Sequence, residues 1–515
     1  MEEEKAKTVD FLSHKLLVDE DGNNLLHQAA LEGKNQNVKV FLENELFDLE
    51  AKNYLGETAL SCALKMENDE TFQLLSDFGA DLSQTFQNKN GKMRSSISRD
   101  EDGNTLLHRA VLKNSCVNII LENNRYELEA KNRKKETALH CAARTGHVGV
   151  VGLLIEKGVE LEARDEHGET SLFTAIKHQH EQVVKHLIIS GADLHAQNNN
   201  QDTPLHLASL LNNAKIVQLL LERKPGADLE ARNNTQQTPI HHASFIGNTK
   251  IVQLLLERKA NIEARDHNGE TPLFKAIEFG HDQVAEELII SGANLEIRNV
   301  FQETPLHFAS LLNNTKIVQL LLERKPNLHE AKDRDGNTPL FKAIFAGLEQ
   351  VAEQLIMSGA DLTTRNNHQH GLLQLASCMG NTKIVQLLLE RKPNLEAIDD
   401  DGDTPLCDAI IWGHYEIVKL LHGAGASLNA TSKNGKTLLH KAASSNCLSR
   451  EDNKRIVEFL LENKANIAAK DNDKNIPLHD AGLSNCHIVK LLIDGGSNLD
   501  AKNDSGETPP RTLFL

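Results

Sequence analysis

The chain has 515 residues, with 39% hydrophobic and 25% charged side chains, a composition typical of a packed protein rather than a disordered, collagen-like or membrane protein. Aromatic residues make up only 4%, and 73 acidic against 56 basic side chains give a formal net charge of −17. The scarcity of aromatic side chains argues against nucleic acid as a partner, and the net negative charge repels both nucleic acid and anionic lipid. We therefore expect partners with apolar, mixed or basic protein surfaces.

The beginning of the sequence carries no signal for export. Met1 to Lys5 precede no apolar segment, and no uncharged apolar run approaches the ~20 residues that a membrane helix needs. Seven scattered cysteines never form a CxxC pair. We therefore expect a cytoplasmic protein without membrane insertion, with reduced and mostly buried cysteines.

A four-residue phrase close to Thr-Pro-Leu-His recurs along the whole chain. Twelve of its fourteen intervals measure 32 to 35 residues, and the other two measure 47 and 39. A period of this size predicts stacked units of the same supersecondary structure, with insertions in the two long intervals. The copies begin at Asn24, Thr58, Thr105, Thr137, Thr170, Thr203, Thr238, Thr271, Thr304, Thr338, Gly371, Thr404, Thr437, Ile476 and Thr508.

Each repeat predicts two short helices, as the copy at residues 266–298 illustrates. Thr271 is a good N-cap and Pro272 suits the first helical position, because the missing N–H of proline would have no partner there. Apolar residues at helical spacing continue to about Gly280, and a second amphipathic helix begins near Asp282. The weakly alternating segment that follows predicts a connecting hairpin arm.

Helices this short are marginal alone, so neighbouring pairs must stack to form a continuous core. The phrase stands as Thr-Pro-Leu-His-Leu-Ala from Thr203 and as Thr-Pro-Leu-His-Phe-Ala from Thr304, and Gly-Ala-Asp-Leu from Gly359 closes a second helix. In order, spacing and number these motifs resemble the ankyrin repeat family. The resemblance implies an all-α fold with short β-hairpin connections, an ankyrin-repeat α-solenoid of about 14 stacked helix pairs.

On this basis we expect three segments. Residues 1–20 are an N-terminal capping segment, residues 21–507 are the ankyrin repeat array with insertions near 87–99 and 444–452, and residues 508–515 are an incomplete terminal repeat. The first insertion is basic and polar, which fits either a passive surface loop or a regulatory loop. The Glu-Arg-Lys sequences that end several second helices fit either a solvated convex face or a basic ridge.

Motifs for nucleotide binding or catalysis are absent from the sequence, which contains no P-loop, HExxH or GxSxG motif. The glycine of the calcium-like run Asp399–Asp403 falls at the fourth loop position instead of the sixth. We therefore expect no cofactor, no metal and no catalytic residue. The resemblance implies structural hydrogen bonds near the helix start for the eight histidines in the fourth place of the phrase, which are His27, His108, His140, His206, His241, His307, His440 and His479.

The most informative variation lies at the end of the first helices, which faces the concave groove in ankyrin-like folds. Seven consecutive repeats carry large apolar residues there, in the seventh or eighth place after the start of the phrase. The alternative is that the first residue of each pair, such as Phe345, only packs between repeats. With a hairpin tip at Val300 and Phe301, the candidate partner-binding residues are Leu211, Ile246, Phe279, Val300, Phe301, Leu312, Met379 and Trp412.

The function that follows from the resemblance is a non-catalytic scaffold, a monomer that binds protein partners along the groove. Blocks of two repeats were duplicated together, since Asn248–Lys259, Asn314–Lys325 and Asn381–Lys392 share one sequence. Long duplicated arrays of this kind resemble those of intracellular bacteria, which implies an effector or adaptor in a host cytosol. The alternative is the recognition part of an enzyme or enzyme-recruiting protein whose active region lies beyond Leu515.

Overall fold

The computed structural model describes residues 18–66, 68–81, 99–114, 117–123, 128–223, 226–445, 450–481 and 486–509. Within these residues the regular structure is helical, and the β-pairing consists of two isolated bridges, Arg365 with Gly371 and Thr431 with Thr437. The expected all-α solenoid is confirmed, and its connections are mainly tight turns. The chain forms two compact units, Met1–His242 and Ala243–Leu515.

The described residues contain the expected series of helix pairs, one for each of fourteen copies of the phrase. The first helices of the pairs are α2 (Leu25–Glu32), α4 (Ala59–Lys65), α6 (Leu106–Lys113), α8 (Ala138–Thr145), α10 (Ser171–Lys177), α12 (Pro204–Leu210), α14 (Pro239–Ile246), α16 (Pro272–Glu278), α18 (Pro305–Leu311), α20 (Pro339–Phe345), α22 (Leu372–Cys378), α24 (Pro405–Ile411), α26 (Leu438–Ser444) and α28 (Pro477–Asp480).

The second helices are longer in most pairs and follow within a few residues. They are α3 (Asn35–Glu43), α5 (Asp69–Asp77), α7 (Val117–Asn123), α9 (Val148–Glu156), α11 (Glu181–Ile189), α13 (Ala214–Glu222), α15 (Thr249–Glu257), α17 (Asp282–Ile290), α19 (Thr315–Arg324), α21 (Glu349–Met357), α23 (Thr382–Leu389), α25 (Tyr415–Gly423), α27 (Arg450–Glu462) and α29 (Cys486–Asp494). The 3-10 helix η3 (Pro326–Glu330) follows α19.

The ends of the helices form as the sequence predicts. Thr271 is the extended N-cap of α16 and Pro272 is its first residue. Gly280, which follows the C-cap, has a φ of 71°, and this left-handed conformation lets the chain reverse into α17. Glycine adopts this conformation without strain, whereas Asn212 and Asn313 take the same place after α12 and α18.

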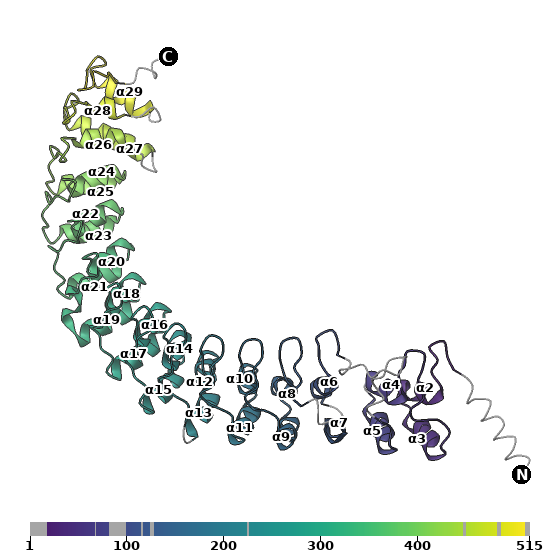
Figure 1. Cartoon of the computed structure of the whole chain (residues 1–515). Helices are drawn as coiled ribbons and strands as arrows, with labels where there is room; N and C mark the ends of the chain where they lie inside the picture. Colours follow the sequence, from purple (N-terminus) through teal and green to yellow (C-terminus); the bar gives the residue numbers. More distant parts are fainter. Residues whose placement is uncertain are drawn as a thin grey trace, which may run out of the picture. The chain divides into compact units, whose positions relative to one another are not determined.

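The core lies between the two helices of each pair and between successive pairs. In the repeat of α16 and α17, Leu273, Ile277, Val284 and Leu288 are at most 1% exposed. Within each unit the first helices pack on one another in one layer and the second helices pack in a layer beside them (Figure 1). Each pair thus buries its apolar stripes against neighbours, which accounts for helices too short to be stable alone.

A ladder of buried polar side chains joins the turns of successive repeats. Asn132 Oδ1 accepts hydrogen bonds from the backbone N–H groups of Lys134 and Glu136, which closes its own turn. Asn132 Nδ2 donates to Oδ1 of Asn104 in the preceding repeat at 3.0 Å. The same pairing joins Asn53 to Asn23 and Asn503 to Asn475. The turns are therefore fixed to one another as well as to their helices.

Several sequence expectations fall partly on residues outside those described. The insertion at 87–99 is described only at Arg99, and within the insertion at 444–452 the residues Arg450–Asp452 form the first turn of α27. Residues 1–17 of the expected N-terminal cap and 510–515 of the expected terminal repeat also lie outside the described residues.

Candidate partner-binding surface

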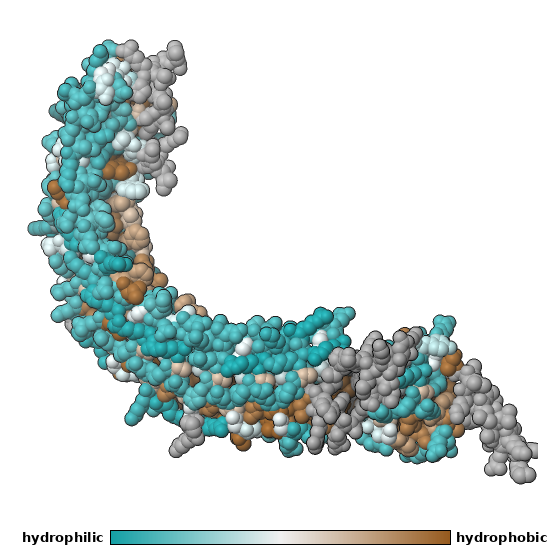
Figure 2. Space-filling model, in the orientation of Figure 1, coloured by the Kyte–Doolittle hydropathy of each residue, from teal (hydrophilic) through white to brown (hydrophobic). Residues whose placement is uncertain are grey.

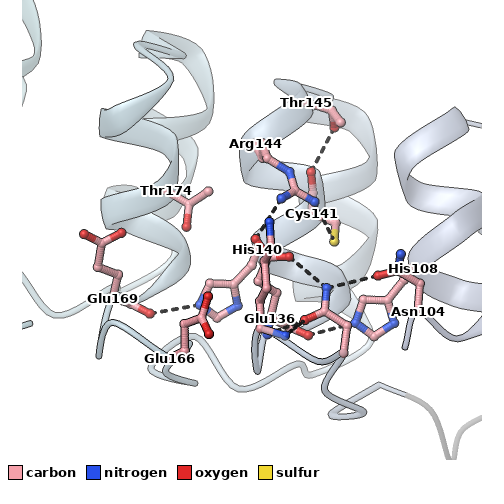
Figure 3. Close-up of polar contacts among 12 residues, drawn as sticks. Asn104, His108, Glu136, His140, Cys141, Arg144, Thr145, Glu166, Glu169 and Thr174 are labelled. Carbon is pink, nitrogen blue, oxygen red and sulfur yellow. Dashed lines mark hydrogen bonds and ion pairs between the residues drawn. The ribbon is translucent and has the colours of Figure 1, made fainter. Parts of the chain in front are cut away.

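The histidines of the phrase are part of the framework. His108 Nδ1 lies 2.8 Å from Oγ1 of Thr105, and His108 Nε2 lies 2.9 Å from the carbonyl oxygen of Glu136 in the next repeat. His140 makes the same bond to Glu169 at 3.0 Å (Figure 3). Because a carbonyl can only accept, Nε2 carries a proton. Nδ1 of His108 accepts from the backbone N–H of Thr105 at 3.3 Å, so it carries none and the ring is neutral. Burial lowers the pKa of both histidines, which favours the neutral form.

The same ring bond to the next repeat is made at five other copies of the phrase, which confirms the structural role that the resemblance implies. These histidines are His27, His206, His307, His440 and His479. Three repeats have phenylalanine in this place, and Phe173, Phe274 and Phe341 are at most 1% exposed. There the ring fills the core instead, and in the first of these repeats Oγ1 of Thr170 is buried without a hydrogen-bond partner.

One cluster of possible metal ligands lies in the described residues. His440, Asp471 and Asp480 each bring a nitrogen or oxygen atom within 4.8 Å of the others. Both ring nitrogens of His440 are already used, because Nδ1 is 3.2 Å from the backbone nitrogen of Thr437 and Nε2 is 2.9 Å from the carbonyl oxygen of Asn475. The proximity of these three residues is explained by the repeat framework.

The described cysteines are not arranged for chemistry. They form no disulfide, and Cys486 alone among them is exposed. Burial raises the pKa of Cys62 and Cys141 to about 12, so both thiols stay protonated and unreactive at neutral pH. Cys116 and Cys447 lie outside the described residues.

The candidate binding residues occupy the ends of the first helices and one turn. In the unit Ala243–Leu515, the exposed fraction is 45% for Phe279, 45% for Leu312, 37% for Met379, 56% for Trp412, 52% for Val300 and 51% for Phe301. Ile246 of the same unit is half-buried, as is Leu211 of the unit Met1–His242.

Five consecutive first helices, α16 to α24, each end in a large exposed apolar side chain. We call the set of Phe279, Leu312, Phe345, Met379 and Trp412 the apolar stripe. Each of these helices packs on the next in the unit Ala243–Leu515. Apolar side chains gather along the edge of this unit over α18, α20 and α22 (Figure 2).

Phe345 is the most exposed member of the apolar stripe, at 61%. The sequence places it in the first position of its pair, where packing between repeats is the alternative, and Ala346 follows it. Its exposure shows that a first-position residue can also face solvent. Phe245, another first-position residue, does pack between repeats, because its ring lies 4.4 Å from that of Phe279, edge to face.

Lysines lie one turn before the apolar stripe on two of its helices. Lys275 of α16 pairs with Glu270, and its side chain is 9% exposed. Lys342 of α20 lies 2.9 Å from both Glu303 and Asp333. Burial alone would lower the pKa values of both lysines, but the acidic neighbours raise them. Both lysines are therefore charged, and they neutralise the carboxylates beside them.

The comparison with known families fits this geometry. The family described as ankyrin repeats (3 copies) matches residues 2–86, 89–165, 107–198, 162–233, 225–299, 273–366, 364–432 and 419–503. The chain belongs to the ankyrin repeat family. Its membership explains the two-layer stack and the phrase histidines.

Relatives of this ankyrin chain are similar over only part of its length. Human inversin is 29% identical over 211 residues, which is 39% of this chain and 19% of inversin. The chicken nuclear factor NF-kappa-B p105 subunit is 28% identical over 199 residues, 36% of this chain and 20% of that protein. The yeast probable 26S proteasome regulatory subunit p28 is 28% identical over 196 residues, 37% of this chain and 70% of that protein. This chain thus aligns with about a fifth of inversin and of the p105 subunit.

The helices of the described residues also bear on membrane insertion. None of them combines the length and the apolar character that crossing a bilayer requires.

Proposed function

We propose that this chain is a non-catalytic scaffold and that the unit Ala243–Leu515 binds a segment of a protein partner along the apolar stripe. An ankyrin array indicates a role in protein–protein interaction. The single observation that carries the location is the exposure of five large apolar side chains on five helices that pack in succession. Contiguous exposed apolar surface is uncommon on proteins and usually marks a binding surface.

The stripe has the properties of an anchor for a peptide segment. Its members stand one repeat apart, so side chains spaced along an amphipathic helix or an extended segment can meet successive first helices. Trp412, the single tryptophan of the chain, stands at one end, and tryptophan is enriched among residues that dominate binding energy.

The test is a binding measurement with a double variant. A partner is isolated with the full chain, and its affinity is measured for the wild type and for Trp412→Ala with Phe345→Ala. We expect a loss of roughly 2–4 kcal/mol in binding free energy, because both side chains are large and Phe345 lies in the middle of the stripe. Circular dichroism should show the same melting temperature within about 2 °C, since both side chains are more than half exposed.

A matched control comes from the second helices of the same unit. Ile290 of α17 and Met357 of α21 are exposed by 57% and 73%, and both lie outside the apolar stripe. Ile290→Ala with Met357→Ala should leave the affinity unchanged. Equal affinity for wild type and stripe variant, or equal loss in stripe variant and control, would refute the location.

A further inference from the structure

The first helices of four repeats differ in the charge that they carry at one position. The fifth residue of the phrase is Lys275 in α16, Lys342 in α20 and Lys441 in α26, and each of these lysines pairs with carboxylates of the turns beside it. In α24 the same position holds Asp408. A carboxyl group therefore stands where these three repeats place a lysine.

The surroundings of Asp408 are themselves acidic. The preceding turn runs from Asp399 to Asp403, with Asp399 and Asp403 buried and Asp400 and Asp401 exposed. Burial, and then the charges of Asp399 and Asp403, raise the pKa of Asp408 to about 8. The negative charge of the aspartates in this repeat is therefore poorly compensated by neighbouring basic side chains.

The basic side chains close to this turn already have partners. Lys441 Nζ lies 2.7 Å from Oδ2 of Asp403, and His370 Nε2 lies 3.3 Å from Oδ2 of Asp399. The other oxygen of Asp403 is buried without a hydrogen-bond partner in the described part of the chain. Asp408 makes no ion pair within the described residues. The repeat therefore contains carboxyl oxygens that have no hydrogen-bond or ion-pair partner in the described part of the chain.

This acidic group adjoins the apolar stripe. Asp408 and Trp412 are four residues apart on α24 and its C-cap, so their side chains lie one helical turn apart on one face. Helix α22 packs on both α20 and α24, which places Phe345, Met379 and Trp412 on three successive helices. The indole ring of Trp412 also offers a face for a cation, the contact known as cation–π.

We propose that the partner segment is basic as well as apolar: an arginine or lysine of the partner lies between Asp408 and the ring of Trp412, while its apolar side chains pack on Phe345 and Met379. The cation takes the role that Lys275 and Lys342 have in their own repeats. This inference rests on the proposed function, and it adds the chemical class of the partner. Charge complementarity of this kind sets which partner binds, as well as how fast.

The test is a selection from a displayed library of random 12-residue peptides on the full-length chain. Clones that also bind the variant Trp412→Ala with Phe345→Ala are removed, so that the survivors need the apolar stripe. We expect the survivors to be enriched in arginine or lysine next to large apolar residues and depleted in acidic residues. Their affinity, measured at pH 9 where Asp408 is ionised in the free chain, should fall at least tenfold on Asp408→Asn.

Two further variants make the result independent of folding defects. Asp408→Lys reproduces the lysine of α16, α20 and α26, so it should fold, pair with Asp399 or Asp403, and weaken the selected peptides about a hundredfold. Asp102→Asn, at an exposed turn of the unit Met1–His242, should change nothing. Melting temperatures are measured for each variant alongside the affinities.

The outcomes separate this inference from the proposed function. Survivors that are neutral or acidic, or that bind Asp408→Lys as well as wild type, would overturn the basic partner and leave the stripe as a binding surface. A selection that yields no clone dependent on Trp412 and Phe345 would contradict the proposed function, and the inference with it.

Discussion

The side-chain amide of Gln374 in α22 donates a hydrogen bond of 2.8 Å to the carbonyl oxygen of Asp403 in the next repeat. Its Oε1 accepts from the backbone N–H of Gly371 at 2.9 Å. Gln374 thus makes the two bonds that the phrase histidines make elsewhere, without a titratable ring. Gln374 therefore shows that glutamine in place of a phrase histidine preserves both hydrogen bonds and removes the titratable group.

The first prediction is that His307→Gln reduces the loss of stability in acid. Burial lowers the pKa of His307 to about 4, below its ordinary value of 6.5, so the unfolded chain binds the proton more tightly. The stabilisation is therefore fully present above pH 6.5 and is lost as the pH falls towards 4. Between pH 7 and pH 5 this group alone should lose about 2 kcal/mol.

Thermal and denaturant unfolding at several pH values check this prediction. His307→Gln should lose less stability than wild type from pH 7 to pH 5, whereas His307→Ala, which removes both hydrogen bonds, should be destabilised at every pH. An identical pH dependence for wild type and His307→Gln would show that this ring does not titrate with folding.

The second prediction is that Asp408→Asn stabilises the chain in neutral and mildly alkaline solution. Because the pKa of Asp408 is raised from 3.8 to about 8, the folded state holds a proton that the unfolded state releases. Stability from this group is present below pH 4 and is lost as the pH rises to 8. The variant should melt roughly 2–4 °C higher than wild type at pH 8.5 and equally near pH 3.5. Asp400→Asn, at an exposed site of the same turn, is the control and should show no such gain.

The third prediction contrasts a buried lysine with an exposed one. Lys275 lies 3.3 Å from Asp266 and 2.5 Å from Glu270, both buried, so Lys275→Met leaves carboxylates without their cation and should cost about 3–5 kcal/mol. Lys383 pairs with Glu349 at 2.8 Å but its side chain is 73% exposed, so Lys383→Met should leave the free energy of unfolding nearly unchanged. Hydrogen exchange should show the loss of protection in α16 and its neighbours. Equal costs for the two variants would contradict this assignment.

The fourth prediction separates packing from exposure within the apolar stripe. Phe279→Ala removes the edge-to-face contact with Phe245 and should destabilise by about 0.5–1.5 kcal/mol beyond the loss of buried area. Phe345→Ala removes the side chain with the largest exposed fraction in the stripe and should change stability by less than about 0.5 kcal/mol. Denaturant midpoints of the two variants give the comparison, which fails if Phe345→Ala proves the more damaging.

The fold could be predicted from the sequence because it follows from local rules repeated many times. Threonine as N-cap, proline at the first position and glycine after the helix end mark many of the first helices, and the period identifies the stack. The histidine bonds were available only through the resemblance, since spacing alone does not show that His108 reaches a carbonyl in the next repeat.

The candidate site was predicted less completely, for reasons visible at particular residues. Trp412 and Phe279 stand out as large apolar residues at one recurring place. Phe345 stands in the other position of the pair, and exposure there depends on how neighbouring repeats pack. The unpaired carboxyl group of Asp408 could not be recognised before its burial and the pairing of Lys441 with Asp403 were known. Comparison with Lys275 and Lys342 at the same phrase position could nevertheless have signalled it.

The most direct test of the account is the fluorescence of Trp412, which is the only tryptophan of the chain and therefore reports on the apolar stripe alone. On titration with the partner, or with a peptide selected on the stripe, the emission should shift to shorter wavelength and acrylamide quenching should fall, because the indole ring that is 56% exposed in the free chain becomes covered. Saturable binding, measured by calorimetry, that leaves both the emission and the quenching of Trp412 unchanged would contradict the claim that partners bind along the stripe.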